Sequence, residues 1–148
     1  MFQKILVCLD GSKLAEQILP YAAEEAARFG SSLVLFQVVS LASIPTPTGI
    51  ESVPVAVPNG QLADAEAAAR DYLNGLAGPL RDKGLKVQCA TMVGHPAESI
   101  VSYAEENKFD LVAIATHGRS GLKRLVFGSV ADYVIRKSGL PILLIKPK

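Results

Sequence analysis

The chain has 148 residues and a formal net charge of +1, because 15 lysines and arginines nearly balance 14 aspartates and glutamates. A chain of this length can bury a full hydrophobic core as one domain without disulfides or metals. The balanced charge excludes a protein whose main surface binds nucleic acid or an anionic membrane, and a hydrophobic content of 49% excludes a disordered chain.

The first elements are two apolar runs separated by a helical pattern. Residues 4–9 and 33–39 are almost continuous in apolar side chains, which is typical of strands buried on both faces of a parallel sheet. Apolar residues at helical spacing predict a helix over residues 13–29, and Gly30 is a natural end for it. Pro20 falls inside this helix, where we expect it to remove one backbone hydrogen bond.

Residues 40–60 interrupt the regular alternation. The segment contains four prolines and shows no hydrophobic period. Structureless loops of this length are uncommon in compact domains, where they serve as lids or binding loops or remain mobile. A mobile solvated insertion is the simpler interpretation, and a lid over a ligand is the more specific alternative.

The next predicted helix covers residues 61–77, which are rich in alanine and glutamate. We expect Gly75, Gly78 and Pro79 to bend or interrupt its continuation to Lys83.

The rest of the chain alternates strands and helices again. The remaining elements are a mixed run at 87–93 at a sheet edge, a helix that Pro96 opens and that ends near Asn107, an apolar run at 111–116, a helix from near Ser129 to Ser138, and a final run at 142–146.

This order of elements predicts a single α/β domain over residues 1–148. We expect a doubly wound, Rossmann-like sandwich with right-handed crossovers, built from a five-stranded, mostly parallel sheet and four helices. The expected strand order is 3-2-1-4-5.

Cysteine usage and the N-terminus predict a cytoplasmic protein. Cys8 and Cys89 show no CxxC or Cys/His spacing, so we expect small buried hydrophobes rather than a disulfide framework or a zinc site. The N-terminus shows no signal-peptide pattern. The longest apolar run, at 140–145, is too short to cross a bilayer. We therefore expect neither a membrane nor a nucleic acid as partner.

Ligands of open α/β sheets bind beyond the carboxyl ends of the strands, where the strand order reverses. Asp10, Gly11 and Ser12 follow the first strand. Asp10 is a candidate ligand-binding carboxylate; it could instead serve only as a helix cap, or as a phosphoacceptor, although no second acidic residue lies beside it.

The segment after the fourth strand has the chemistry of an anion cradle. Gly118 allows the backbone to approach a ligand closely, and Gly128 and Ser129 open a helix whose free N–H groups favour phosphate. Three cations, Arg119, Lys123 and Arg124, fall within this segment. The alternative is a glycine-rich turn before an ordinary helix.

Familiar phosphate motifs and catalytic sets are missing from the sequence. There is neither a GxxxxGK[ST] loop nor a GxGxxG after the first strand. His95 and His117 have no metal-ligand spacing and no neighbouring nucleophile pattern, so we expect them to belong to turns. We therefore expect a protein that is not an enzyme.

Five sequence features together resemble the universal stress protein family over nearly the whole chain. They are the start at Val7–Ser12, the Val93-Gly94-x-Pro96 turn, the THGRSG loop, the GSVA segment, and the PILLIK end. Members of the family often carry a G-x2-G-x9-G-[ST] pattern associated with ATP binding. Gly118, Gly128 and Ser129 match its second part, and Ala115 stands at the position of its first glycine.

The resemblance implies roles for individual residues in binding ATP. Asp10 is similar to the acidic residue near the ribose or near a nucleotide-bound Mg²⁺ or Mn²⁺. Val38 resembles the backbone contact to adenine. The other implied contacts are Ile114 and Ala115 in the adenine pocket, with Gly118, Arg119, Gly128, Ser129 and Val130 at the phosphates and ribose.

The resemblance also implies a homodimer that pairs through the final strand, Ile142 to Ile145, although a helix or the chain's own tail could cover this strand instead. The leading hypothesis is a cytoplasmic, ATP-binding regulatory or protective module of the stress response. Two alternatives remain: a nucleotide-independent protein that acts through protein partners, and a slow ATP hydrolase or adenylyl-transferring enzyme.

Overall fold

The computed structural model describes residues 1–40, 59–116 and 128–148. Five parallel strands form one sheet in the order β3-β2-β1-β4-β5, which confirms the predicted order and the edge position of residues 87–93. The strands are β1 (Lys4–Leu9), β2 (Ser32–Val39), β3 (Lys86–Val93), β4 (Leu111–Ala115) and β5 (Ile142–Ile145).

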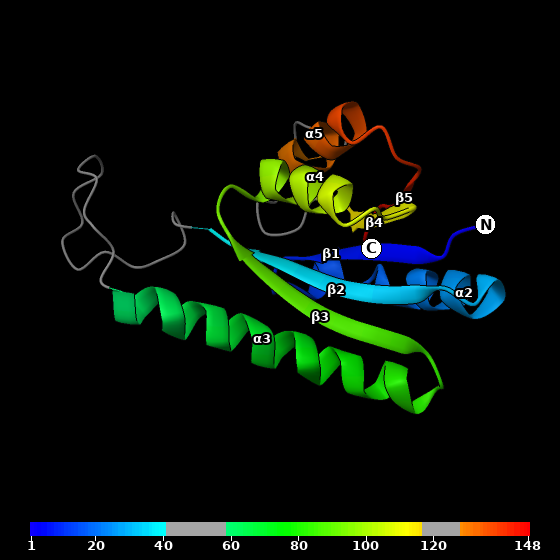
Figure 1. Ribbon diagram of the computed structural model, residues 1–148, viewed down its shortest axis with the longest axis horizontal. Coiled ribbons are helices and arrows are strands. Elements are labelled where there is room, and N and C mark those ends of the chain that lie inside the picture. The colour runs from blue at the N-terminus through cyan, green and yellow to red at the C-terminus, as the bar shows by residue number, and fades with distance from the viewer. Residues whose placement is uncertain (41–58, 117–127) are drawn as a thin grey trace.

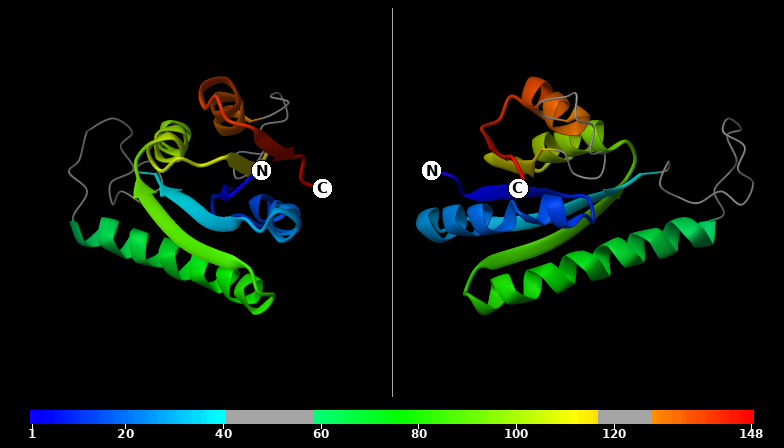
Figure 2. Two further views of the ribbon diagram at one scale, coloured as in Figure 1. Left: turned by 45° about the vertical axis from the view of Figure 1, so that its right-hand side comes forward. Right: turned by 180° about the vertical axis from the view of Figure 1, so that it is seen from behind.

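Helices cover both faces of the sheet, as the doubly wound prediction requires (Figure 1). α4 and α5 lie on one face, and α2 and α3 lie on the other, as the views from two further directions also show (Figure 2). The described helices are α1 (Lys13–Glu16), α2 (Leu19–Phe29), α3 (Asn59–Asp82), α4 (Pro96–Glu106) and α5 (Ser129–Lys137). None of them is long and apolar enough to span a membrane.

The central strand β1 shows why its sequence is continuously apolar. Ile5 and Val7 belong to the core layer beneath α1, α2 and α3, whereas Leu6 and Cys8 belong to the layer beneath α4 and α5. Successive side chains of a strand point to opposite faces, so a strand that is covered on both sides needs an apolar residue at every position.

The expected helix over residues 13–29 is divided into α1 and α2, so the four predicted helical segments become five helices within the described residues. α1 ends at Glu16, and Pro20 lies in the first turn of α2. A proline in a first helical turn removes a backbone N–H that has no intrahelical partner in any case. The expectation that Pro20 removes a hydrogen bond from the helix interior is therefore wrong.

The expected interruption of the second helix is also wrong. α3 runs without a break through Gly75, Gly78 and Pro79. Leu73 and Ala77 on its inner face are fully buried against the sheet. Tertiary packing of this face outweighs the low helix propensity of glycine and proline.

The predicted loop at residues 40–60 lies almost entirely outside the described residues. Ser40 precedes the gap, and α3 begins at Asn59. Its interpretation as a lid or as a solvated insertion stays a prediction.

Candidate functional site

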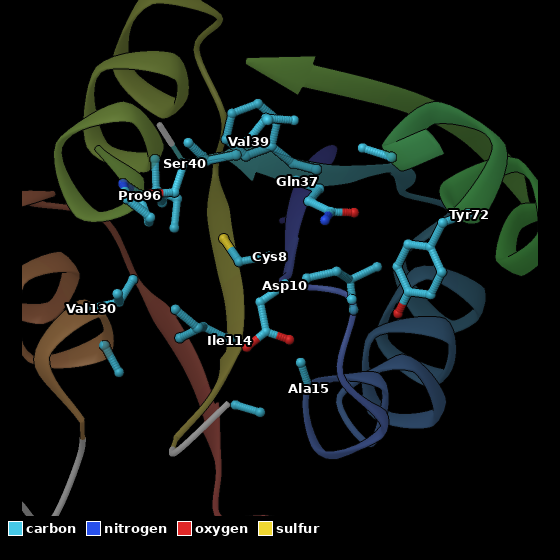
Figure 3. Close-up of a pocket in the computed structure, with 18 of the residues that line it drawn as sticks. Cys8, Asp10, Ala15, Gln37, Val39, Ser40, Tyr72, Pro96, Ile114 and Val130 are labelled. Carbon is cyan, nitrogen blue, oxygen red and sulfur yellow. The ribbon is translucent and has the colours of Figure 1, made fainter. Parts of the chain in front are cut away.

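A cleft opens at the carboxyl edge of the sheet, where β1 ends between β2 and β4 (Figure 3). The chain leaves β1 for β2 on one side and reaches β4 on the other, so this is the point at which the strand order reverses. The cavity measures about 570 Å³, which is a volume typical of small-molecule sites.

The cleft brings together the predicted site residues that fall in the described part of the chain. Those that line it are Asp10, Val38, Ile114, Ala115, Gly128, Ser129 and Val130. They come from the ends of β1, β2 and β4 and from the start of α5. Gly118 and Arg119 lie outside the described residues, as do Lys123 and Arg124.

Asp10 stands in the middle of the cleft, with its carboxylate between the walls (Figure 3). Its Oδ1 accepts a hydrogen bond from the backbone N–H of Ser12 at 2.8 Å. The N-cap of α1 is Ser12 itself, whose hydroxyl oxygen accepts from the backbone N–H of Ala15 at 3.1 Å. Asp10 therefore supports the turn at Gly11 rather than capping the helix directly.

The opposite end of the cleft is formed by the beginning of α5. Gly128 is the N-cap, with φ 74° and ψ 153°, and no side chain of the described residues caps the helix. Ser129 and Val130 follow it in the first turn, where backbone N–H groups have no intrahelical acceptor. Together with the positive end of the helix dipole, these N–H groups form a site suited to an anion.

Sequence reasoning missed a third wall, which α3 supplies. Ala65, Ala68, Ala69 and Tyr72 line the cleft from this helix. Their spacing of three and four residues places them on one helix face, so the alanine pattern of residues 65–72 was the available signal.

Tyr72 links this wall to α1. Its hydroxyl group donates a hydrogen bond to Oε1 of Glu16 at 2.8 Å. Desolvation, this hydrogen bond and the nearby charge of Asp10 raise the pKa of Tyr72 above its usual range. The hydroxyl group of Tyr72 is therefore neutral, and its proton is donated in the hydrogen bond to Glu16.

Gln37 was also missed, although a glutamine inside the run LVLFQVV is conspicuous. Its side chain lines the cleft, and its buried Oε1 accepts no hydrogen bond from the described residues.

Cys8 lies in the lining between the strand ends and is only 5% exposed. Burial raises the pKa of its thiol far above the usual range, so the group is a thiol and not a nucleophilic thiolate. Cys89 is partly buried, and desolvation raises its pKa while Arg81 opposes the shift. The expectation of a buried hydrophobe is confirmed for Cys8 and is true only in part for Cys89.

The buried thiol predicts a pH dependence of stability. Above the unfolded-state pKa of about 8.5, unfolded Cys8 loses its proton while the folded protein keeps it, so stability falls as pH rises. Loss of this one proton from the unfolded chain lowers the free energy of unfolding by roughly 2 kcal/mol between pH 8.5 and 10. Urea unfolding of the wild type and of Cys8→Ala across this range measures the difference. Cys89→Ala should remove a smaller part of the pH dependence, because Arg81 opposes the pKa shift at that thiol. Equal slopes for wild type and Cys8→Ala would contradict the prediction.

A metal site made by the protein alone is not found in the described part of the chain, where no three His, Cys, Asp or Glu side chains cluster. Asp10 can supply one carboxylate to a cation, whose remaining oxygen ligands would come from a ligand's phosphates and water.

Comparison with known proteins identifies relatives of the whole chain. The model of the universal stress protein family matches residues 1–146. Universal stress protein MJ0577 of Methanocaldococcus jannaschii is 28% identical over 157 residues, covering 100% of this chain and 97% of that protein. Its solved structure gives a TM-score of 0.83 and covers 100% of this chain and 98% of its own.

Two further solved structures share the fold at lower identity. A universal stress protein in complex with cAMP is 21% identical, with a TM-score of 0.65 over 99% of this chain and 98% of that one. An Arabidopsis thaliana protein of the same family with AMP bound is 14% identical, with a TM-score of 0.65 over 99% and 92%. The match of the family model over nearly all residues, together with the fold, shows that this chain belongs to the universal stress protein family.

Proposed function

We propose that this protein binds ATP in the cleft and acts as a nucleotide-dependent regulatory or protective module of the stress response. The observation that carries the proposal is that the Asp10 carboxylate and the N-terminus of α5 face one cavity of about 570 Å³. A carboxylate suits ribose hydroxyls or a phosphate-bound cation, and a helix N-terminus suits phosphate. The cAMP and AMP complexes of proteins with this fold support the choice of an adenine nucleotide.

The proposed contacts follow the geometry of the cleft. The backbone of Val38, with Ile114 and Ala115, contacts the adenine. Gly128, Ser129 and Val130 contact the phosphates and ribose from the start of α5. The family resemblance implies that Gly118 and Arg119, which lie outside the described residues, contact the same groups.

Ala115 does not close the cleft. Its side chain is nearly buried at the end of β4, and the cavity of about 570 Å³ exists with this methyl group in place. The departure from the family's first glycine is therefore compatible with a bound nucleotide.

A divalent cation fits this proposal as a companion of the nucleotide. Asp10 would hold Mg²⁺ or Mn²⁺ together with phosphate oxygens, and the cation would neutralise part of the phosphate charge.

We propose binding without turnover. The described lining includes no histidine, and its cysteine, Cys8, is held as a thiol. General acid–base or nucleophilic catalysis would require an activated group at hydrogen-bond distance from the phosphates.

The proposal is tested on the untagged full-length protein. Mass spectrometry of the small molecules released on denaturation is expected to find ATP, and calorimetry with Mg²⁺ or Mn²⁺ is expected to give saturable binding. Ser129→Ala should weaken binding several-fold, because one donor to the phosphates is lost. Ser102→Ala is the matched control, since Ser102 lies on α4 outside the cleft lining.

Absence of ATP from the purified protein and from calorimetry with either cation would overturn the proposal in favour of a nucleotide-independent module. Steady release of ADP that Asp10→Asn abolishes would instead support the slow hydrolase.

The cytoplasmic location, the single domain over residues 1–148 and the homodimer are parts of the same proposal. The dimer is supported by the position of β5, which pairs with β4 at one edge of the sheet and is only half-buried. An apolar edge strand of this kind needs a cover. A monomeric mass by light scattering would contradict the dimer.

A further inference from the structure

Gln37 occupies a defined position at the floor of the cleft. In the parallel register it lies beside Leu9 of β1 and Thr91 of β3, so it is one step deeper in the sheet than Asp10. Leu33 and Leu35 precede it on the face of β2 that packs beneath α3. The alternation of side chains therefore directs Gln37 toward α3, and Figure 3 shows its carboxamide on the same side of the cleft as Tyr72, above Asp10 in this view.

The carboxamide oxygen is an unused acceptor in the described structure. Oε1 of Gln37 is buried from solvent and receives no hydrogen bond from the described residues. Leaving a buried acceptor unsatisfied is unfavourable, and each such group in a native structure calls for an explanation. A ligand that brings a donor to this point would remove the penalty.

The surroundings of Gln37 define what kind of ligand group can reach it. Ala15, Ala65 and Ala69 line the same cleft and present only methyl groups to it, so this wall suits a flat apolar ring. The hydroxyl proton of Tyr72 is already donated to Glu16, and Asp10 adds a carboxylate. The polar groups here are thus mainly acceptors, so the matching ligand edge must carry an N–H donor rather than a phosphate.

We propose that Gln37 is the specificity-determining residue for the base, with its Oε1 accepting a hydrogen bond from the exocyclic 6-amino group of a purine. The inference rests on the proposed function and extends it: the nucleotide site also recognises the amino-bearing edge of the base. An adenine edge presents an amino donor beside a ring-nitrogen acceptor, which a glutamine amide matches with its own acceptor and donor. The ribose and phosphates then extend toward Asp10 and the start of α5.

The experiment pairs one protein change with one ligand change. Calorimetry compares ATP with purine riboside 5′-triphosphate, which lacks the 6-amino group, on wild type and on Gln37→Met. Wild type is expected to bind the analogue roughly tenfold more weakly than ATP, because one hydrogen bond is lost and its buried acceptor is left unpaired. Gln37→Met is expected to bind both ligands equally, each about as weakly as wild type binds the analogue.

Two further variants keep the test interpretable. Gln88→Met makes the same substitution at an exposed position of β3 outside the cleft and should retain the tenfold discrimination. Gln37→Leu also removes the acceptor and is expected to bind both ligands equally, so it replaces Gln37→Met if that variant fails to fold, whereas Gln37→Glu retains acceptor oxygens and should still discriminate against the analogue. Thermal unfolding of each variant separates a loss of folding from a loss of recognition.

The outcomes separate this inference from the function on which it rests. If wild type binds ATP and Gln37→Met keeps the full preference for ATP over the analogue, the role of Gln37 is overturned while nucleotide binding stands. Binding of 2′-deoxy-ATP is compared with that of ATP in the same two proteins. If Gln37→Met abolishes the difference in affinity between ATP and 2′-deoxy-ATP but keeps the difference between ATP and the amino-free analogue, Gln37 contacts the ribose and the assignment to the base is wrong. If wild type binds no adenine nucleotide, the proposed function itself fails.

Discussion

Replacing Phe36 by alanine is expected to lower the free energy of unfolding by about 3–5 kcal/mol. Phe36 is fully buried on β2, and its ring stacks on Tyr103 of α4 with centroids 4.4 Å apart and planes 9° from parallel. Truncation loses this contact and leaves a cavity between the sheet and α4, which the surrounding side chains can fill only in part.

Chemical denaturation of Phe36→Ala and of the matched variant Phe29→Ala measures this effect. Phe29 is 46% exposed, and its ring makes an edge contact with Phe2 at a centroid distance of 5.6 Å. We expect Phe29→Ala to cost about 1 kcal/mol or less. Similar losses for the two variants would contradict the buried stack as a main source of stability. Because Phe36 also lines the cleft, Phe36→Ala should weaken ligand binding as well.

Gly128→Ala is expected to lower stability by about 1–3 kcal/mol and to weaken nucleotide binding tenfold or more. A backbone with φ 74° and ψ 153° is accessible almost only to glycine, so an added Cβ strains it. Relief of this strain would move the first turn of α5, whose residues line the cleft and whose first N–H groups have no acceptor within the helix. A small displacement of such donors is sufficient to lose hydrogen bonds to phosphate.

Urea unfolding and calorimetry with ATP measure the two effects separately. Gly78→Ala is the matched control, because Gly78 lies inside α3 with open space where a Cβ would be placed. That substitution should be neutral or stabilising, since alanine is the better helix former, and it should leave binding unchanged. Unaltered ATP affinity in Gly128→Ala would show that the start of α5 does not hold the phosphates.

Much of the fold could be predicted because strong local signals coincide with burial. Runs such as residues 5–9 are apolar at every position because helices cover both faces of β1, and a short apolar run bounded by polar residues is typical of such a strand. The errors arose where local propensity and tertiary packing disagree. Gly75, Gly78 and Pro79 disfavour a helix, yet burial of Leu73 and Ala77 against the sheet maintains α3 through them.

The candidate site could be predicted where a residue follows directly from strand order. Asp10 and Gly128 were expected near one another because the carboxyl ends of neighbouring parallel strands meet at one edge. The wall made by Ala65, Ala69 and Tyr72 could not be located, because the packing angle of a crossover helix depends on core side chains from several strands. Gln37 was not predicted for a related reason. An amide within an apolar strand indicates a binding site only once the structure shows that its buried oxygen accepts no hydrogen bond from the described residues.

The central position of β1 has a consequence for the order of events during synthesis. β1 is synthesised first, although in the finished sheet it lies between β2 and β4. Its partner β4 and the first turn of α5 are synthesised near the end of the chain. A nascent chain therefore carries Asp10 without the helix terminus that faces it in the finished cleft. A ligand that needs both would bind only the completed fold and stabilise it by mass action, so its cellular concentration would set how large the free energy of unfolding of a finished molecule is.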